Sequence, residues 1–296
     1  MKVAIIDLGT NTFHLLIAEV NLDEKKVLYK TNKPVRLGED ITLANRIIDR
    51  AFERGVTCLK EFKETMNQHG VGQVKAVATS GVRSAINGQN FVDAVKEHTG
   101  IVIDVIDGNE EANYIYKGVK WSGAISNPSL IMDIGGGSTE FILCDPHQLL
   151  WKKSYNVGAA RLMQMFFKSD PISQVDELNI VEHLDSQLAD LLEACKIHRP
   201  EVLIGSAGAF ETFELMINNR MSDPTATIDY AEYRKLATTL KNSNHNDRTN
   251  MNGLIPLRVD MIVMAAILTD YVLDKLEIKK IKLSTFDLKM GVLSSL

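Results

Sequence analysis

One strand–turn–strand pattern occurs twice in this chain, and the two copies lie 126 residues apart. Residues 3–12 read VAIIDLGTNT, and residues 130–138 read LIMDIGGGS. In each copy an apolar segment ends in Asp-x-Gly, a hydroxyl residue follows five positions after the Asp, and a second apolar segment then begins. The repeat predicts two similar domains in succession, although two unrelated glycine turns could produce the same pattern by chance.

Apolar segments of strand length alternate with helical patterns in both halves, which indicates α/β sheets that carry helices. The chain has 296 residues, enough for one large or two medium domains. The sequence predicts strands at about 2–7, 13–20, 26–36, 74–79, 101–106, 129–133, 139–145, 148–156, 202–205 and 280–283. It predicts helices at about 44–67, 88–99, 109–121, 158–167, 173–196, 207–219, 230–241 and 258–275, with one more at the end. We expect domains at 1–122 and 123–296, with the last helix packing back on the first domain.

Charge and apolar content exclude several classes of protein. The net charge is −5, neither half is basic, and no run of Lys or Arg occurs, which argues against binding of duplex nucleic acid over a broad face. A small anionic ligand in a focused site remains compatible with this balance. The longest apolar run, 261–268, is far shorter than the ~20 residues that span a bilayer. Asp7 stands too early for a signal peptide.

The cysteines and histidines predict neither a disulfide framework nor a zinc site. Three cysteines without ligand spacing are typical of reduced, buried thiols in a cytoplasmic protein, and no histidine pair has metal spacing. We therefore expect a cytoplasmic location without a membrane. A homodimer is expected only because it is the commonest oligomer.

The second copy of the repeat carries the stronger chemical signal, because residues 133–140 read DIGGGSTE. Three consecutive glycines allow close approach of a ligand to the backbone, and the amides of such a turn bind anionic oxygen. A hairpin between two strands would need only a two-residue turn. The first copy has one glycine and three polar residues, so the pair suggests two phosphate loops that face each other across a cleft.

Further motifs extend along the chain. They are IDLGTNTF (6–13), VRLGE (35–39), ATSGVRSA (78–85), IDGNEEA (106–112), MDIGGGSTEF (132–141), NVGAARL (156–162), IGSAGA (204–209) and RVD (258–260). In order and spacing they resemble the exopolyphosphatase / guanosine pentaphosphate phosphohydrolase (Ppx/GppA) phosphatase family, in its short two-domain form, of the actin-like ATPase superfamily. The resemblance implies an α/β fold of two ribonuclease-H-like domains with an interdomain cleft. The implied reaction is a hydrolysis that releases terminal phosphate from inorganic polyphosphate or guanosine pentaphosphate, with Mg²⁺ or another divalent cation.

The resemblance also implies roles for particular residues. Glu111 matches the catalytic carboxylate and Arg83 a phosphate-contacting arginine, while Asp133 and Glu140 match the metal region. The implied phosphate-binding residues are Asp7, Gly9, Thr10, Asn11, Thr12, Gly135, Gly136, Gly137, Ser138 and Thr139. From the residues alone, Glu111 could instead be one of two acids that favour the first turn of a helix, and Arg83 a surface ion-pair partner.

A second anion or nucleotide contact is expected at Gly205, Ser206 and Gly208, where superfamily relatives hold an adenosine, and at Arg258. A tight strand–helix turn explains the two glycines equally well. Arg161 is a further candidate for an anion path. His14 stands where the family often has arginine, and residues 284–291 (STFDLKMG) keep only part of the usual Ser-x-x-Gly-Leu-Arg-Glu-Gly ending.

Three functions follow from these observations. The first is a Mg²⁺-dependent hydrolase of polyphosphate or of guanosine pentaphosphate, in which water attacks in line within the cleft. We expect short polyphosphate chains, because longer family members add C-terminal helical domains and this chain stops at 296. The alternatives are an ATP-dependent kinase of the same superfamily and a non-catalytic sensor of polyphosphate or guanosine tetraphosphate.

Overall fold

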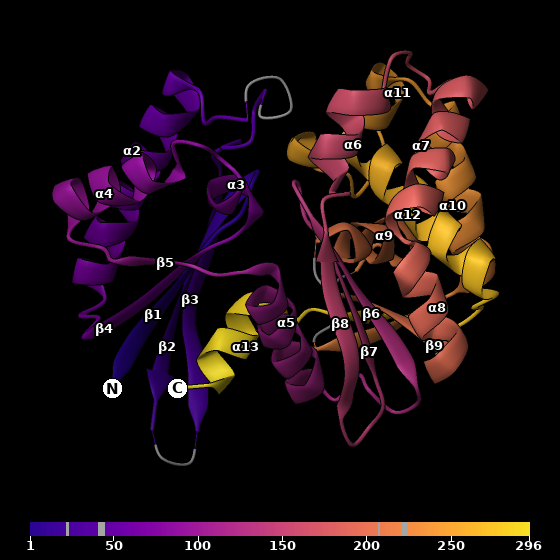
Figure 1. The fold of residues 1–296 in the computed structure, drawn as a ribbon. Helices are drawn as coiled ribbons and strands as arrows, with labels where there is room; N and C mark the ends of the chain where they lie inside the picture. The colour runs from indigo at the N-terminus through magenta and orange to yellow at the C-terminus, as the bar shows by residue number, and fades with distance from the viewer. Residues whose placement is uncertain (22–23, 41–44, 207, 221–223) are drawn as a thin grey trace.

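Both halves of the chain form the open sheet with helices that the alternating pattern predicts. The computed structural model describes residues 1–21, 24–40, 45–206, 208–220 and 224–296, and Figure 1 shows its two sheets next to each other. The first half contains β1 (Lys2–Leu8), β2 (Thr12–Val20), β3 (Lys25–Pro34), α2 (Asp49–Gln68), β4 (Gln73–Ala78), α3 (Ser80–Arg83), α4 (Gly88–Thr99), β5 (Ile103–Val105) and α5 (Gly108–Ser122).

The second half repeats this order with additional helices. It contains β6 (Ser129–Ile134), β7 (Thr139–Cys144), β8 (Leu149–Tyr155), α6 (Ala159–Phe166), α7 (Gln174–Gln187), α8 (Ala189–His198), β9 (Val202–Ser206), α9 (Gly208–Asn218), β10 (Thr225–Ile228), α10 (Tyr230–Asn242), α11 (His245–Thr249), the 3₁₀ turn η1 (Pro256–Arg258), α12 (Met261–Leu276), β11 (Ile281–Ser284) and α13 (Leu288–Ser294).

The two sheets share one topology. The first has the order β3-β2-β1-β4-β5, and the second has β10-β11-β9-β6-β7-β8. In each sheet the three strands that come first in the sequence, β1–β3 and β6–β8, pair as antiparallel neighbours. The later strands β4, β5, β9 and β11 run parallel to β1 or β6, and the extra edge strand β10 is antiparallel to β11. The expected fold of two ribonuclease-H-like α/β domains is therefore confirmed.

Three apolar layers hold the sheets and helices together. One layer packs α2 and α4 on the first sheet, and another packs α6–α10 and α12 on the second sheet. The middle layer lies between the sheets, where Val3 and Ile5 of β1 join Ile131 of β6 and Ile204 of β9 in one cluster. Strands β1 and β6 are thus buried on both faces, which explains why they read as continuous apolar runs.

The C-terminal helix α13 leaves the second sheet and packs on α5 and β1 of the first half (Figure 1). The approach is close because glycines lie at the contact: a Cβ on Gly291 would come within 1.7 Å of the Tyr114 carbonyl oxygen. Lys25 of β3 donates to the Leu293 and Ser294 carbonyls and so caps the end of α13. The start of α13 lies beside the C-terminal half of α5, because a Cβ on Gly118 would come within 2.2 Å of the Asp287 carbonyl oxygen.

Several predicted elements differ in extent. The helix expected at 173–196 divides at Leu188, which is fully buried and has φ −106° and ψ 13°, so α7 and α8 are separate. The helix expected from 44 begins at Asp49, and residue 44 lies outside the described residues. Strand β10 was not predicted, because four residues at a sheet edge give little pattern.

The first sheet ends at Val105 and the second begins at Ser129, so the expected boundary at 122/123 falls in the link after α5.

Candidate active site

The two copies of the sequence repeat form two matching hairpin turns. In the first, the Gly9 amide donates to the Thr12 carbonyl (3.2 Å), and in the second the Gly135 amide donates to the Ser138 carbonyl (3.0 Å). The turns touch, because a Cβ on Gly136 would lie only 2.6 Å from Asn11 Nδ2. The sequence repeat is therefore also a structural one, and it brings the turns together at one cleft.

Helix α6 fixes the orientation of the glycine turn. The amides of Ala159 and Ala160 donate to the carbonyls of Gly135 (2.9 Å) and Gly136 (3.0 Å), and Arg161 Nε donates to the Gly137 carbonyl (3.1 Å). Because these carbonyls are engaged on the α6 side, the turn can present its amide N–H groups to an anion on the other side. Arg161, expected along an anion path, instead supports the turn.

A cavity of about 370 Å³ lies between the turns and the two sheets. This is a normal size for a small-molecule site. The predicted site residues that line it are Asp7, Gly9, Thr10, Asn11, Thr12, Glu111, Asp133, Gly135, Gly136, Gly137, Ser138, Glu140, Gly208 and Arg258. Residues from both halves of the chain therefore contribute to one cavity.

Three residues in a row cross the second sheet at the cavity. Asp133 of β6 pairs with Glu140 of β7, which pairs with Ser154 of β8. The Ser154 hydroxyl donates to Glu140 Oε1 (2.6 Å), and the Ser206 hydroxyl donates to Asp133 Oδ2 (2.9 Å). Burial and the neighbouring Glu140 raise the pKa of Asp133 well above its ordinary value. Burial also raises the pKa of Glu140, against its hydrogen bonds from Ser154 and Ser138.

The first half of the chain supplies an ion pair that faces this row. Glu111 stands in the first turn of α5, whose N-cap Asp107 accepts from two backbone amides. Arg83, at the end of α3, donates through Nη1 to Glu111 Oε2 (2.9 Å) and to the Ile106 carbonyl (2.9 Å). Burial and the adjacent Glu140 raise the pKa of Glu111 well above its usual range, although Arg83 opposes the shift. A carboxyl with a raised pKa is suited to accept a proton.

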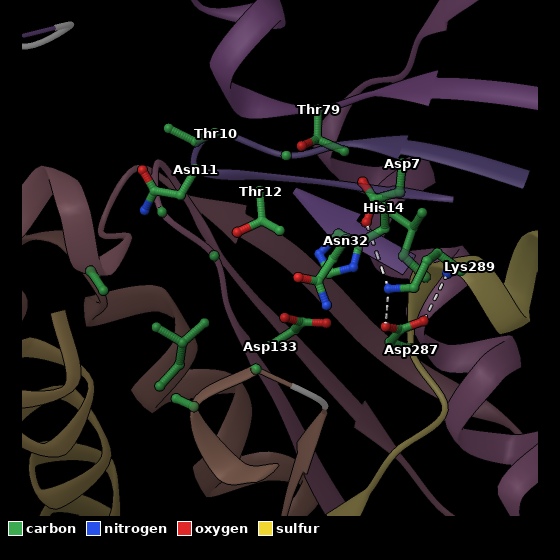
Figure 2. A pocket seen from close by; sticks show the side chains of 18 of the residues that line it. Asp7, Thr10, Asn11, Thr12, His14, Asn32, Thr79, Asp133, Asp287 and Lys289 are labelled. Carbon is green, nitrogen blue, oxygen red and sulfur yellow. Dashed lines mark hydrogen bonds and ion pairs between the residues drawn. The ribbon is translucent and has the colours of Figure 1, made fainter. Parts of the chain in front are cut away.

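A matching row crosses the first sheet. Asp7 of β1 pairs with His14 of β2, which pairs with Asn32 of β3, and all three line the cavity. Figure 2 shows Lys289 between the carboxylates of Asp7 and Asp287. Asp287 is the N-cap of α13, so the second half of the chain supplies this ion pair.

The charges in this second row are set by burial and by Lys289. Burial raises the pKa of Asp7 to about 6, against the attraction of Lys289. Burial, Lys289 and Arg258 lower the pKa of His14 to about 3, so its imidazole is neutral at pH 7. Burial opposes ionisation of Lys289 and Asp287, but their mutual attraction raises the pKa of the lysine and lowers that of the aspartate. The pair is therefore fully charged.

Four predicted site residues do not line the cavity. Arg83 reaches it through Glu111, and Ser206 through Asp133. Thr139 is fully buried and its hydroxyl donates to the Val157 carbonyl (3.1 Å), because it points to the face of β7 opposite Glu140. Gly205 packs against the Phe210 ring.

The strand–helix turn after β9 closes the other side of the cavity. Arg258 lines the cavity and donates to the Gly208 carbonyl and the Thr212 hydroxyl. Its guanidinium thus secures the start of α9, and burial lowers its pKa, against the attraction of Glu211. Ala207 of this motif lies outside the described residues.

Several residues of the cavity wall were not among the predicted site residues. They are Lys30, Asn32, Thr79, Ser80, Asp287 and Lys289, together with His14, which the sequence marked only as a departure from the family pattern. The sequence repeat could have identified His14, because His14 follows Asp7 by seven positions as Glu140 follows Asp133. The structure shows both as cross-strand pairs.

The donor set is compatible with a divalent cation. Asp133 and Glu140 are cross-strand neighbours with carboxylate oxygens, the ligand type that Mg²⁺ prefers. In the described part of the chain no group of three or more His, Cys, Asp or Glu side chains is arranged to hold a metal on its own. The carboxylate pair is of the kind that Mg²⁺ uses, since this ion usually takes one or two carboxylates and completes its shell with water and substrate phosphate.

Comparison with known proteins gives matches over the whole chain. The model of the Ppx/GppA phosphatase family matches residues 16–296. A relative from Haemophilus influenzae is 31% identical over 296 residues, which cover 100% of this chain and 91% of the relative. Relatives from Vibrio vulnificus and Pseudoalteromonas translucida, named guanosine-5'-triphosphate,3'-diphosphate pyrophosphatases, are 29% and 27% identical over 85% and 99% of this chain. The match covers only 50% and 59% of these two longer proteins.

Solved structures agree with the sequence matches. The crystal structure of an exopolyphosphatase from Cytophaga hutchinsonii has a TM-score of 0.95 and 35% identity, and covers 100% of this chain and 97% of that one. The PPX-GPPA enzyme of Aquifex aeolicus has a TM-score of 0.82 and 27% identity, with 100% and 99% covered.

Proposed function

The chain belongs to the Ppx/GppA phosphatase family, and on that premise we propose that it releases the terminal phosphate of inorganic polyphosphate, of guanosine pentaphosphate, or of both. Family membership places it among the phosphoanhydride hydrolases, since relatives and solved structures bear the names exopolyphosphatase and guanosine-5'-triphosphate,3'-diphosphate pyrophosphatase. Among polyphosphates we propose short chains, in keeping with a cavity of about 370 Å³.

The observation that carries this proposal is the Glu111–Arg83 pair at the cavity between the two turns. Phosphoryl transfer needs little covalent chemistry from the protein, and depends on position and charge. Glu111 is buried and faces a second carboxylate, so it holds a proton more tightly than an ordinary glutamate. Arg83 fixes the orientation of that carboxylate through a direct hydrogen bond of 2.9 Å.

The mechanism assigns one task to each group. The turns at Gly9–Thr12 and Gly135–Ser138 hold the terminal phosphoryl group through backbone amides and hydroxyls. Glu111 accepts a proton from water as the water oxygen forms its bond to phosphorus. The bridging P–O bond then breaks, and the shortened substrate leaves with the bridging oxygen and its electron pair.

A divalent cation fits beside Asp133 and Glu140, which would hold it. Mg²⁺ bound there would supply charge neutralisation for the phosphate oxygens. Ser206 and Ser154 orient these two carboxylates from the far side. These two hydrogen bonds come from the protein itself, so they position Asp133 and Glu140 for either proposed substrate.

We extend the proposal to the cellular location and the partners of the protein. All three cysteines are buried and free, in keeping with a reducing cytoplasm. No helix in the described ranges is long and apolar enough to cross a membrane. We keep a homodimer and a lack of duplex nucleic-acid binding as expectations.

Phosphate release from four substrates tests the proposal. Tripolyphosphate, long-chain polyphosphate, guanosine pentaphosphate and ATP are compared at equal concentration with Mg²⁺ or with EDTA. We expect release from at least one of the first three, little from ATP, and loss of release in EDTA. Binding of these anions without any release would instead support a sensor, and transfer from ATP to an acceptor would support a kinase.

A further inference from the structure

A buried hydroxyl in the cavity wall has no partner. Among the described residues, Ser80 Oγ and Thr269 Oγ1 are the buried side-chain oxygens without a hydrogen bond. Thr269 lies within α12 beside Tyr233, in the apolar layer of the second domain. Ser80 is 2% exposed and lines the cavity. An unsatisfied buried hydroxyl destabilises a protein, and in native structures it calls for an explanation such as a missing ligand.

The surroundings of Ser80 indicate what the ligand is. A Cβ on Gly137 would lie 2.5 Å from Ser80 Oγ and 2.8 Å from Thr10 Oγ1. Two hydroxyls of the first domain therefore converge on one point of the glycine turn of the second. Only a glycine at position 137 leaves space there, since any side chain would displace the Ser80 hydroxyl.

The chain around Ser80 connects it to the reaction. Ser80 directly follows β4 and Thr79, and Arg83, three residues later, contacts Glu111. A terminal phosphoryl group carries charge on three oxygens, and a hydroxyl beside the two turns can donate to one of them. Arg83 Nη1 is engaged with Glu111 and the Ile106 carbonyl, and Arg83 does not line the cavity, whereas Ser80 does.

We propose that the Ser80 hydroxyl donates a hydrogen bond to a non-bridging oxygen of the terminal phosphoryl group, beside the Thr10 hydroxyl and opposite the Gly137 backbone. The inference rests on the proposed hydrolase function and adds a binding residue to it. It also gives the Ser80 hydroxyl a partner that the described part of the chain does not supply.

The S80A variant tests this inference through activity and stability together. We expect kcat/KM for the preferred substrate to fall about 10- to 100-fold, the effect of losing one hydrogen bond to a charged group. Inhibition by added orthophosphate should weaken in parallel. The melting temperature of the ligand-free variant should stay unchanged or rise, because alanine removes a buried donor without a partner.

The matched control is S129A. Ser129 is also 2% exposed, but its hydroxyl donates to the Asn127 carbonyl (2.7 Å), far from the cavity end of β6. We expect S129A to melt at a lower temperature with unchanged kcat/KM, the opposite of S80A.

Two results would overturn the inference. If S80A lost activity only in proportion to a lower melting temperature, Ser80 would be structural. If S80A kept the wild-type kcat/KM and orthophosphate inhibition, its hydroxyl would have no contact with phosphate. Failure of the wild-type protein to release phosphate from any substrate would instead remove the proposed function, so the two failures are distinct.

Discussion

The cleft consists of two halves with the same architecture and different charges. In the Glu140 half, the row Asp133–Glu140–Ser154 of the second sheet faces Glu111 and Arg83 from the first domain. In the His14 half, the row Asp7–His14–Asn32 of the first sheet faces Asp287 and Lys289 from the second domain. Each sheet thus meets an ion pair that the opposite domain supplies near the start of a helix.

The two halves differ in how firmly their protons are held. Burial raises the pKa values of Glu111, Asp133 and Glu140, and the carboxyl of Glu140 raises those of Glu111 and Asp133 further. In the His14 half, Lys289 and Asp287 hold each other charged, and His14 is neutral. On the proposed function, proton transfer takes place in the Glu140 half, whereas in the His14 half the Lys289–Asp287 pair stays charged and His14 stays neutral, as a fixed frame.

Replacing Glu111 gives the largest expected effect. E111Q removes the proton acceptor but keeps the shape, so we expect kcat to fall by about 10²- to 10⁴-fold. Steady-state phosphate release measures this, and substrate binding should persist. The control is E110Q, which changes the exposed neighbouring glutamate and should retain wild-type turnover. Equal rates for E111Q and the wild type would exclude Glu111 as the base.

Removing the cation of the His14 half tests the fixed frame. K289M leaves Asp287 and Asp7 buried without their cation, and we expect the free energy of unfolding to fall by about 3–5 kcal/mol. Urea denaturation at pH 7 measures this loss. K289R keeps the charge and should recover most of the stability.

The equivalent change in the Glu140 half should cost less stability. In R83M, the Glu111 carboxyl can take up a proton because its pKa is already raised, so no buried charge is left uncompensated. An equal loss of stability in R83M and K289M would contradict the distinction between the Glu111 carboxyl, which can take up a proton, and the Lys289–Asp287 pair, which stays charged.

Much of this architecture could be predicted from the sequence because it is local. The Asp-x-Gly turns, the apolar strands and the Glu111 helix each lie within a few residues, and the repeat relates the two domains. Asp287 and Lys289 lie in the C-terminal motif at 284–291 but were not predicted as site residues, because α13 crosses to the other domain and Lys289 stands 282 positions from Asp7 in the sequence. Ser80 was missed because a hydroxyl without a partner is recognisable only once its surroundings are known.

Asp7 lies in the His14 half but has a raised pKa like the carboxyls of the Glu140 half, so its effect on stability depends on pH. Its pKa is raised from 3.8 to about 6, so the folded state resists its ionisation, and stability is lost as pH rises through about 6. D7N removes this loss. In EDTA, D7N should therefore be more stable than the wild type above pH 6, by at most about 3 kcal/mol.

Unfolding in urea between pH 3 and 8 measures this difference. It should vanish below about pH 4, where the wild-type Asp7 is protonated in both states. A constant difference at every pH would mean that Asp7 contributes by packing alone.

His14 gives the smallest expected effect and the sharpest test of the fixed frame. An ordinary histidine gains a proton between pH 7 and 6, whereas His14 stays neutral to about pH 3 because it is buried beside Lys289 and Arg258. The acid limb of kcat/KM should therefore lie at the same pH in H14Q as in the wild type, and the His14 ring resonances should not shift between pH 8 and 5. A resonance that titrates near pH 6.5, together with an acid limb that moves in H14Q, would show that His14 exchanges protons like an ordinary histidine, and it would no longer belong to a fixed frame.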